Sequence, residues 1–160
     1  MRKIGHLKQE ALVELYYFAY GSNMNWGQMQ RRCPSAKFVC VARLPDYRFA
    51  IARHSRLRNC GTANIFAEPD SEVWGIVYEV ADQDLITLDG FEDGYCRERV
   101  FVFRMDDGRR PLECLVYVAP REDDPPCPNA EYKRLIVEGA QYWRIPQIYL
   151  AMLQKLQVVE

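Results

Sequence analysis

Short runs of β-branched and aromatic residues recur along most of the chain, with turn-forming residues between them. Such runs are typical of strands, whose side chains alternate between two faces. The turn-like sequence Asp106-Asp107-Gly108 predicts a hairpin between the last two runs. The predicted strands are Tyr16–Tyr20, Lys37–Arg43, Tyr47–Ala52, Thr62–Phe66, Val73–Val80, Arg97–Arg104 and Leu112–Val118.

The run Arg97–Arg104 has apolar residues on both of its faces. Val100 and Val102 point to one side, whereas Phe101 and Phe103 point to the other. Burial on both faces predicts either a central strand or a sheet that curls into a barrel.

Helical spacing of apolar residues appears in fewer places. Asn23, Asp82 and Asn129 stand directly before the first three predicted helices, as N-cap residues do. Pro146 suits the first turn of a final helix. The predicted helices are Met24–Arg32, Gln83–Asp89, Ala130–Trp143 and one that begins near Pro146.

These elements predict a single mixed α/β (α+β) domain with a curled or barrel-like, mostly antiparallel sheet and flanking helices. The proline-rich segment Arg121–Asn129 predicts a loop between the strand-rich body and the helical tail. We expect the domain to span residues 16–160. We expect residues 1–15 to be an N-terminal extension with a loosely held helix, to which we assign no function.

Composition narrows the classes of function. The 160 residues suit one domain, and the formal net charge of -1 gives no long-range attraction to nucleic acid or to an anionic membrane. The six cysteines form no CxxC pair and there are only two histidines, so no metal site is expected. No apolar run is long enough to span a membrane. Reduced thiols in the cytoplasm are the simplest interpretation.

The first candidate for chemistry is Tyr17–Met24, which reads YFAYGSNM. A hydrophobic strand runs into Gly21-Ser22-Asn23, and a helix follows. Glycine lets the backbone approach a ligand, and the amides at a helix start attract anions or carbonyl oxygens. The stretch therefore suits a carboxylate or a developing oxyanion. From the residues alone, a strand-to-helix turn capped by Asn23 remains the simpler alternative.

The second candidate is Glu92. If the helix that begins near Gln83 continues, Glu92 shares the apolar face of Leu85 and Leu88. A carboxylate on an apolar face loses hydration, so its pKa rises and it becomes a better acid or base near neutral pH. Gly90 could end the helix early. The alternative is a surface loop in which Glu92 is solvated.

Two further groups are weaker candidates. The basic stretch RHSRLR, with Arg53, Arg56 and Arg58, could meet an anionic tail of a substrate, although a solvated loop is the simpler interpretation. Cys96 near Glu92 suggests a thiol hydrolase that uses His54. That chemistry requires a fixed Cys–His geometry, which the sequence does not supply.

Taken in order, these stretches resemble the gamma-glutamylcyclotransferase family, and the resemblance covers roughly Tyr17 to Leu153. Leu88-Asp89 stands ahead of Glu92, where the family has its catalytic glutamate. Family members often have Glu-Gly there, but Asp93 and Gly94 follow Glu92 in this chain, so Asp93 remains a second candidate. The other matching stretches are YFAYGSNM at 17–24, PSA at 34–36, CVARL at 40–44, GTANIF at 61–66, EVWGIVY at 72–78, YKRLI at 132–136 and Gly139-Ala140.

The resemblance implies an enzyme that forms 5-oxoproline from a γ-glutamyl amine or amino acid, as in glutathione metabolism. The substrate's α-amino group attacks its own γ-carbonyl carbon, and the amine leaves. Glu92 would be the general acid/base, and Tyr132 would offer its hydroxyl to the pocket. The glutamyl part would be held by the segment formed by Tyr17, Phe18, Ala19, Tyr20, Gly21 and Ser22.

No cofactor is implied, and the expected partner is a small-molecule γ-glutamyl substrate rather than nucleic acid or membrane. The chain would act as a monomer or homodimer. The alternative is a binding module that senses γ-glutamyl compounds without turnover.

Overall fold

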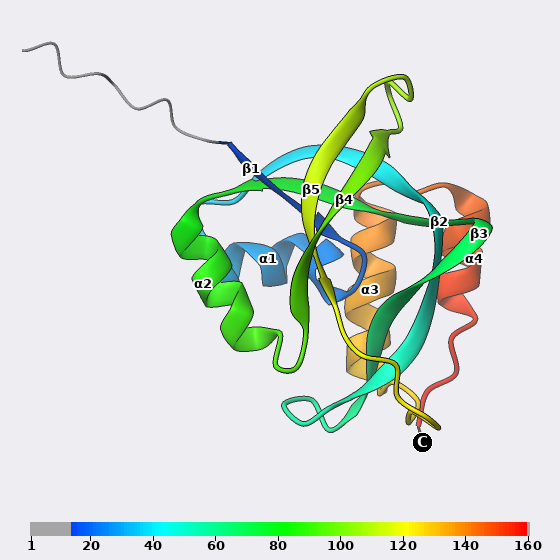
Figure 1. Cartoon of the computed structure of the whole chain (residues 1–160). Helices are drawn as coiled ribbons and strands as arrows, with labels where there is room; N and C mark the ends of the chain where they lie inside the picture. Colours follow the sequence, from blue (N-terminus) through cyan, green and yellow to red (C-terminus); the bar gives the residue numbers. More distant parts are fainter. Residues whose placement is uncertain (1–13, 160) are drawn as a thin grey trace, which may run out of the picture.

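The structure is a computed structural model that describes residues 14–159. Five strands and four α-helices, with one 3-10 turn, form a single α+β domain, as the sequence predicted (Figure 1). In chain order the elements are β1 (Leu15–Ala19), η1 (Ser22–Met24), α1 (Trp26–Arg32), β2 (Lys37–Ser55), β3 (Cys60–Val80), α2 (Asp82–Phe91), β4 (Cys96–Arg104), β5 (Pro111–Val118), α3 (Ala130–Tyr142) and α4 (Gln147–Gln154).

The five strands close into a barrel in the order β1-β3-β2-β4-β5. Neighbouring strands are antiparallel except at the closure, where β1 and β5 run parallel and pair through Tyr17 and Leu115. The barrel prediction is therefore confirmed. The alternative of a central strand buried on both faces is wrong, because Phe101 is 56% exposed whereas Val102 is fully buried. Only one face of β4 points into the barrel.

Two of the strands are longer than predicted. Each of β2 and β3 joins two predicted strands into one element, and the two pair along most of their length. The register shifts between Pro45 and Tyr47, where Asp46 has a positive φ of 60° and its carboxylate accepts the Asp70 N–H at 3.0 Å. The residues between the predicted strands therefore form an irregularity within a continuous ladder.

Two predicted helix caps are wrong. Asn25, rather than Asn23, caps α1, and its side chain accepts the Gln28 N–H at 3.1 Å. The turn η1 lies between β1 and the start of α1, so the Asn23 side chain does not cap the helix and can form other hydrogen bonds. Helix α2 begins one residue earlier than expected, with Ala81 as N-cap, so Asp82 falls inside its first turn.

The cap of α3 is confirmed, since the Asn129 side chain accepts the Tyr132 N–H at 2.8 Å. Helix α3 then packs closely against η1 through Gly139. A Cβ on Gly139 would overlap the backbone of Met24 and Asn25. The Trp143 indole N–H also donates to the Met24 carbonyl, at 3.0 Å. The segment after β1 is therefore held against α3 by backbone contacts.

Figure 1 shows α1 and α2 together on one side of the barrel and α3 and α4 on the other. The predicted loop Arg121–Asn129 is irregular and rests on the β2–β3 hairpin, where the Gly61 N–H donates to the Cys127 carbonyl at 2.9 Å. Within residues 14–159, no helix is long and apolar enough to cross a membrane.

The predicted boundary of the domain falls near the start of β1. Leu15, placed in the N-terminal extension by the sequence, pairs with Val80 as the first residue of β1. Residues 1–13 of that extension, including most of its expected helix, lie outside the described residues.

Candidate active site

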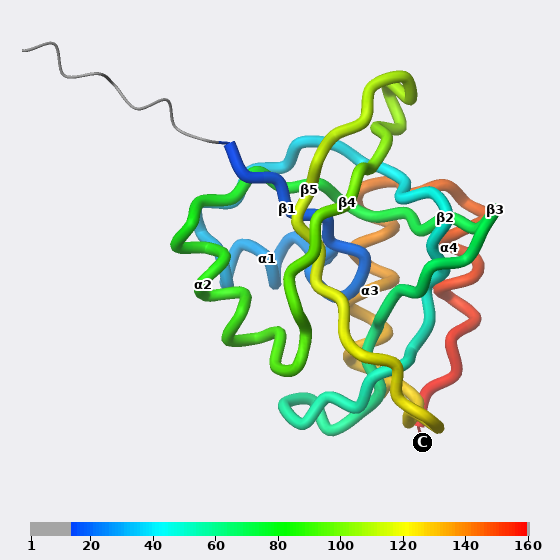
Figure 2. The backbone as a smooth tube through the Cα atoms, viewed as in Figure 1, coloured from blue at the N-terminus to red at the C-terminus, as the bar shows by residue number. Residues whose placement is uncertain are grey.

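A cavity opens at one side of the barrel, where the loop after β1, the β2–β3 turn and the α2–β4 turn meet. Figure 2 shows the latter two turns near each other at the lower edge of the molecule. The cavity is lined by Tyr17, Tyr20, Gly21, Ser22, Asn23, Arg32, Ser55, Arg56, Leu57, Arg58, Thr62, Ala63, Phe91, Glu92, Asp93, Tyr95, Tyr117 and Tyr132.

Glu92 lies directly after α2, as the residue that ends the helix. Its N–H donates to the Leu88 carbonyl at 2.9 Å, so the helix continues past Gly90 and carries Glu92 to the cavity. Burial raises the pKa of Glu92 from 4.5 to about 7, although nearby Arg32, Arg58 and Arg53 oppose the rise. A carboxyl group with this pKa can both accept and return a proton near neutral pH.

The loop after β1 is fixed by a buried polar network. The Gln28 side-chain amide donates to the Ser22 hydroxyl at 2.8 Å and to the Asn23 side-chain oxygen at 3.0 Å. Arg32 donates to the same Asn23 oxygen at 3.1 Å, and the Met24 N–H donates to the Gly21 carbonyl at 3.0 Å. Asn23 therefore holds the loop in shape rather than capping a helix. Such satisfied buried networks rigidify a site.

Tyrosine side chains form another wall of the cavity. The Tyr132 hydroxyl accepts the Ala63 N–H at 2.9 Å, and the Tyr95 hydroxyl donates to the Ala63 carbonyl at 2.6 Å. The Tyr20 hydroxyl donates to the Tyr117 carbonyl at 2.5 Å. Burial raises the pKa of Tyr20, Tyr95 and Tyr132, so these phenols stay neutral.

Most of the predicted site residues meet in this cavity. Glu92, Tyr17, Tyr20, Gly21, Ser22 and Tyr132 line it. Phe18 and Ala19 do not, because both are fully packed in the hydrophobic core. Neither Cys96 nor His54 lines the cavity, so the structure does not assemble the Cys–His pair of a thiol hydrolase there.

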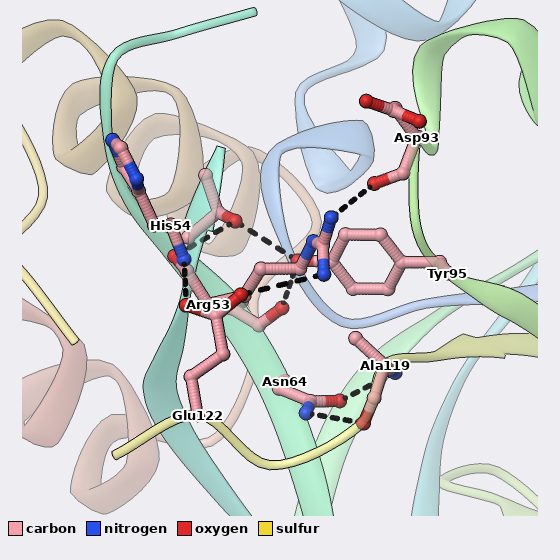
Figure 3. A network of polar contacts seen from close by, with 9 residues as sticks. Arg53, His54, Asn64, Asp93, Tyr95, Ala119 and Glu122 are labelled. Atoms are coloured by element: carbon pink, nitrogen blue, oxygen red, sulfur yellow. Dashed lines mark hydrogen bonds and ion pairs between the residues drawn. The ribbon is translucent and has the colours of Figure 1, made fainter. Parts of the chain in front are cut away.

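Arg53 braces the turn that follows Glu92 (Figure 3). Its guanidinium donates to the Asp93 carbonyl at 2.8 Å, lies over the Tyr95 ring and pairs with Glu122 at 3.5 Å. Gly94 has a φ of +80°, and a Cβ there would overlap the same guanidinium. The Glu122 carboxylate also accepts the His54 N–H at 2.8 Å. The turn is thus tied to the β2–β3 hairpin and to the loop before α3.

Several lining residues were not predicted, among them Arg32, Thr62, Tyr95 and Tyr117. The end of α1, the strands β3 and β5 and the turn before β4 supply them, so no local motif marks them. Arg58 was identified only as part of a basic stretch, for which a solvated loop was the simpler interpretation. Its guanidinium instead contacts Gln28 at 2.8 Å. Within residues 14–159, no group of three or more His, Cys, Asp or Glu side chains is placed to hold a metal ion.

The family model for "Gamma-glutamyl cyclotransferase, AIG2-like" matches residues 17–144. The chain belongs to this family. The gamma-glutamylcyclotransferase of Mus musculus is 33% identical, over 98% of this chain and 84% of that protein. The enzyme of the same name from Homo sapiens is 32% identical, over 90% of this chain and 78% of that protein.

A solved structure named gamma-glutamyl cyclotransferase has a TM-score of 0.84 and 31% identity, covering 92% of this chain and 90% of that one. The resemblance inferred from the sequence is therefore confirmed. The gamma-glutamylcyclotransferase family match extends from within β1 to just past the end of α3, and so includes every residue that lines the cavity.

Gly21 supplies a first test of the cavity. A Cβ at this position would lie 3.3 Å from the Tyr132 hydroxyl and 3.4 Å from the Ala63 Cβ, so one carbon fits tightly and the branches of valine do not. We expect Gly21→Val to lower kcat/KM by at least about 10²-fold, because the loop and ligand can no longer approach each other. Gly21→Ala should have an intermediate effect. Normal kcat/KM in a folded Gly21→Val protein, checked by circular dichroism, would contradict a ligand site here.

Proposed function

We propose that this chain is a gamma-glutamylcyclotransferase, which cyclises a γ-glutamyl group to 5-oxoproline and releases the attached amine or amino acid. Membership of the family and the homologues of that name support this proposal. The observation that carries it is the Glu92 carboxyl group, which lines a cavity bordered by the Gly21-Ser22 loop and whose pKa is raised by burial to about 7.

The reaction needs no water and no external nucleophile. The substrate's α-amino nitrogen forms a bond to its own γ-carbonyl carbon, and the bond from that carbon to the leaving nitrogen then breaks. Forming the lactam N–H takes two protons from the α-ammonium group, and the leaving nitrogen gains two protons to depart as an ammonium group, so atoms and charge balance. Glu92 relays one of these protons, and the other exchanges with solvent. Because both reacting groups belong to one molecule, the enzyme mainly folds the substrate and transfers protons.

Glu92 is the proposed proton carrier. As a carboxylate it accepts the proton of the attacking ammonium, and as the acid it then protonates the leaving nitrogen. The amides near Gly21 and Ser22 bind the glutamyl part and the oxyanion that develops on the γ-carbonyl oxygen. Tyr132, neutral and already fixed by the Ala63 N–H, offers its hydroxyl to the substrate.

We also propose domain bounds, a cellular location and an oligomeric state for the chain. The domain begins with Leu15, the first residue of β1, and the residues before it are an extension of unassigned role. The chain would work in the cytoplasm on a small molecule, as a monomer or homodimer, without nucleic acid or membrane. The nearly balanced charge and the free cysteines of the described residues support this setting.

A direct test is to incubate the protein with γ-glutamyl dipeptides in ¹⁸O-water and to follow 5-oxoproline by mass spectrometry. We expect unlabelled 5-oxoproline and the free amine in equal amounts. Label in the lactam carbonyl beyond that of exchange controls would indicate hydrolysis through free glutamate. Tight binding without product would favour a module that senses γ-glutamyl compounds.

The pH dependence of the reaction offers a second test. The base must be ionised to accept a proton, and burial raises the pKa of Glu92 to about 7. We therefore expect kcat/KM, which reports on the free enzyme, to fall about tenfold for each pH unit below that value. A pH profile that is flat between about pH 5 and 7 would assign proton transfer to another group.

A further inference from the structure

The last turn of α2 carries Glu92 to the cavity but is not anchored in the hydrophobic core. Leu88 is the last buried residue of this helix, and residues 89–91 are exposed. The ring of Phe91 lies at the surface under the Arg32 guanidinium, at 4.1 Å. A helix end with few buried apolar contacts opens easily. The position of Glu92 therefore depends on polar contacts of this last turn.

Asp89 makes the main polar contact of the turn. Its Oδ1 atom accepts a hydrogen bond from the Tyr117 hydroxyl at 2.8 Å and another from the Arg97 Nε atom at 2.8 Å. A second guanidinium nitrogen of Arg97 donates to the Asp89 Oδ2 atom. This bidentate pairing fixes direction as well as distance. The hydrogen bond from Arg97 holds the pKa of Asp89 below its usual range, so the carboxylate is ionised at neutral pH.

The two donors come from neighbouring strands. Arg97 of β4 and Tyr117 of β5 are direct partners in the antiparallel pairing, so their side chains leave the sheet on the same face. Burial, together with the hydrogen bond to Asp89, raises the pKa of Tyr117. Its phenol therefore stays neutral and keeps the proton that it donates. One carboxylate thus ties the end of α2 to two strands of the barrel.

This contact also reaches the cavity. Tyr117 lines the cavity, and its ring lies edge-on to the ring of Tyr17, with the centroids 5.8 Å apart. Glu92 follows Asp89 by three residues, which is less than one turn of helix. A shift of Asp89 would therefore move Glu92 relative to the Tyr117 ring. Because Arg53 braces the turn after Glu92, the carboxyl group is held from both sides.

We infer that Asp89 is a positioning residue for the proposed cyclisation: by holding the end of α2 against β4 and β5, it places the Glu92 carboxyl group at the reacting nitrogen atoms. The inference rests on the proposed function and adds to it a residue that touches no substrate. Asp89 does not line the cavity, so it acts through Glu92 and Tyr117.

The test replaces Asp89 by asparagine and follows the 5-oxoproline formed from γ-glutamyl-alanine. Asparagine keeps the shape of the side chain but loses the charge that pairs with Arg97. We expect kcat to fall about tenfold, less than the 10²-fold that misplaced catalytic groups can cost, because Arg53 still braces the next turn. KM should change little, since Asp89 lies outside the cavity. A variant with the kcat of the parent would overturn the inference.

The pH profile separates positioning from an electrostatic effect. Burial raises the pKa of Glu92 to about 7. If Asp89 positions Glu92, Asp89→Asn lowers kcat/KM by one factor between about pH 6 and 9, and the apparent pKa of the profile stays about 7. If Asp89 acted through its negative charge, the substitution would lower that apparent pKa, and this result would overturn the inference.

Tyr117→Phe removes the hydroxyl group and keeps the ring. We expect a similar fall in kcat, and the double variant with Asp89→Asn should be little worse than either single variant, because both substitutions break the same hydrogen bond. Losses that multiply would show that Tyr117 and Asp89 act independently, which contradicts the inference. Arg97→Gln, at an exposed position, disrupts the same carboxylate from its other side and should also lower kcat with little change in KM.

Arg99→Gln is the matched control. Arg99 lies two residues farther along β4 and pairs with Glu113 of β5 at 3.0 Å, away from α2. It should keep the kcat and KM of the parent, and circular dichroism should show that every variant is folded. A loss in Arg99→Gln as large as in Arg97→Gln would indicate a general weakening of the β4–β5 pair and overturn the inference.

The parent enzyme separates the two levels of the proposal. If the parent forms 5-oxoproline and Asp89→Asn keeps its full kcat, only the positioning role is refuted. If the parent forms no 5-oxoproline, the proposed function is refuted, and the role of Asp89 falls with it.

Discussion

Replacing Glu92 by glutamine is expected to lower kcat by about 10²- to 10⁴-fold, the usual contribution of a positioned acid/base group. Glutamine keeps the size and polarity of the side chain but cannot accept the proton of the attacking ammonium. Substrate affinity should change much less than kcat, because the glutamyl part is held by the loop at Gly21 and Ser22. Single-turnover kinetics together with binding of 5-oxoproline would separate the two effects.

The neighbouring position supplies the control. Asp93→Asn also removes one acidic group, but the Asp93 side chain is exposed, and only its backbone carbonyl is used, by Arg53. We expect activity close to that of the parent. An inactive Asp93→Asn beside an active Glu92→Gln would move the acid/base by one residue, and two active variants would place it elsewhere in the cavity.

Stability gives an independent readout of the same substitution. Burial raises the pKa of Glu92 from 4.5, its value in an unfolded chain, to about 7 in the folded protein. The free energy of unfolding therefore decreases as the pH rises from about 4.5 to about 7, because ionising the buried carboxyl group is unfavourable. Glu92→Gln removes the cost. Its melting temperature should therefore exceed that of the parent at about pH 8 and match it near pH 4, where the carboxyl is protonated in both states.

Gly94→Ala is expected to lower kcat by about 10²-fold, the size that small misplacements of catalytic groups can reach. The φ of +80° is strained for alanine, which costs about 1–2 kcal/mol, and the new Cβ would overlap the Arg53 guanidinium. Arg53 would release the Asp93 carbonyl, and the turn that positions Glu92 would shift. Steady-state kinetics and chemical denaturation would measure both changes.

Gly90→Ala is the matched control, because it adds the same methyl group four residues earlier in the chain. Gly90 lies within α2, and nothing stands within 4 Å of the position of its Cβ. Alanine should leave kcat unchanged and stabilise the helix by about 0.4–1 kcal/mol. If both variants kept full activity, the conformation of the turn after Glu92 would not matter for catalysis.

The sequence predicted the kinds of element better than their ends. The alternating apolar residues of β4 and the Asp106-Asp107-Gly108 turn were sufficient for the hairpin, because both are local signals. Asp46 and Asp70 lie between strands that were predicted to be separate, but they form one irregularity between two long strands, because their interaction depends on the pairing of β2 with β3. The cap at Asn23 failed for a similar reason, because its side chain bonds to Arg32 at the far end of α1.

The candidate site was predicted where its residues form a contiguous motif. The Gly21-Ser22 loop and Glu92 stand out in the sequence, the latter through its spacing from Leu85 and Leu88. Tyr95 and Tyr117 could not be found in this way, because their contribution depends on closure of the barrel. The family resemblance also grouped Phe18 with the site, but its ring is fully buried in the hydrophobic core.

The parallel pairing of β1 with β5 has a consequence for the order of folding. The other strand pairs join neighbours in the chain or elements brought together by the long β2–β3 hairpin. The seam between β1 and β5 instead joins distant segments. Tyr20 and Tyr117, which form a hydrogen bond beside this seam, are 97 positions apart in the chain. Contacts of such long sequence separation carry the largest loop-closure entropy and form late. A refolding chain should therefore recover its far-ultraviolet circular dichroism before its activity, because the cavity exists only once the seam has closed.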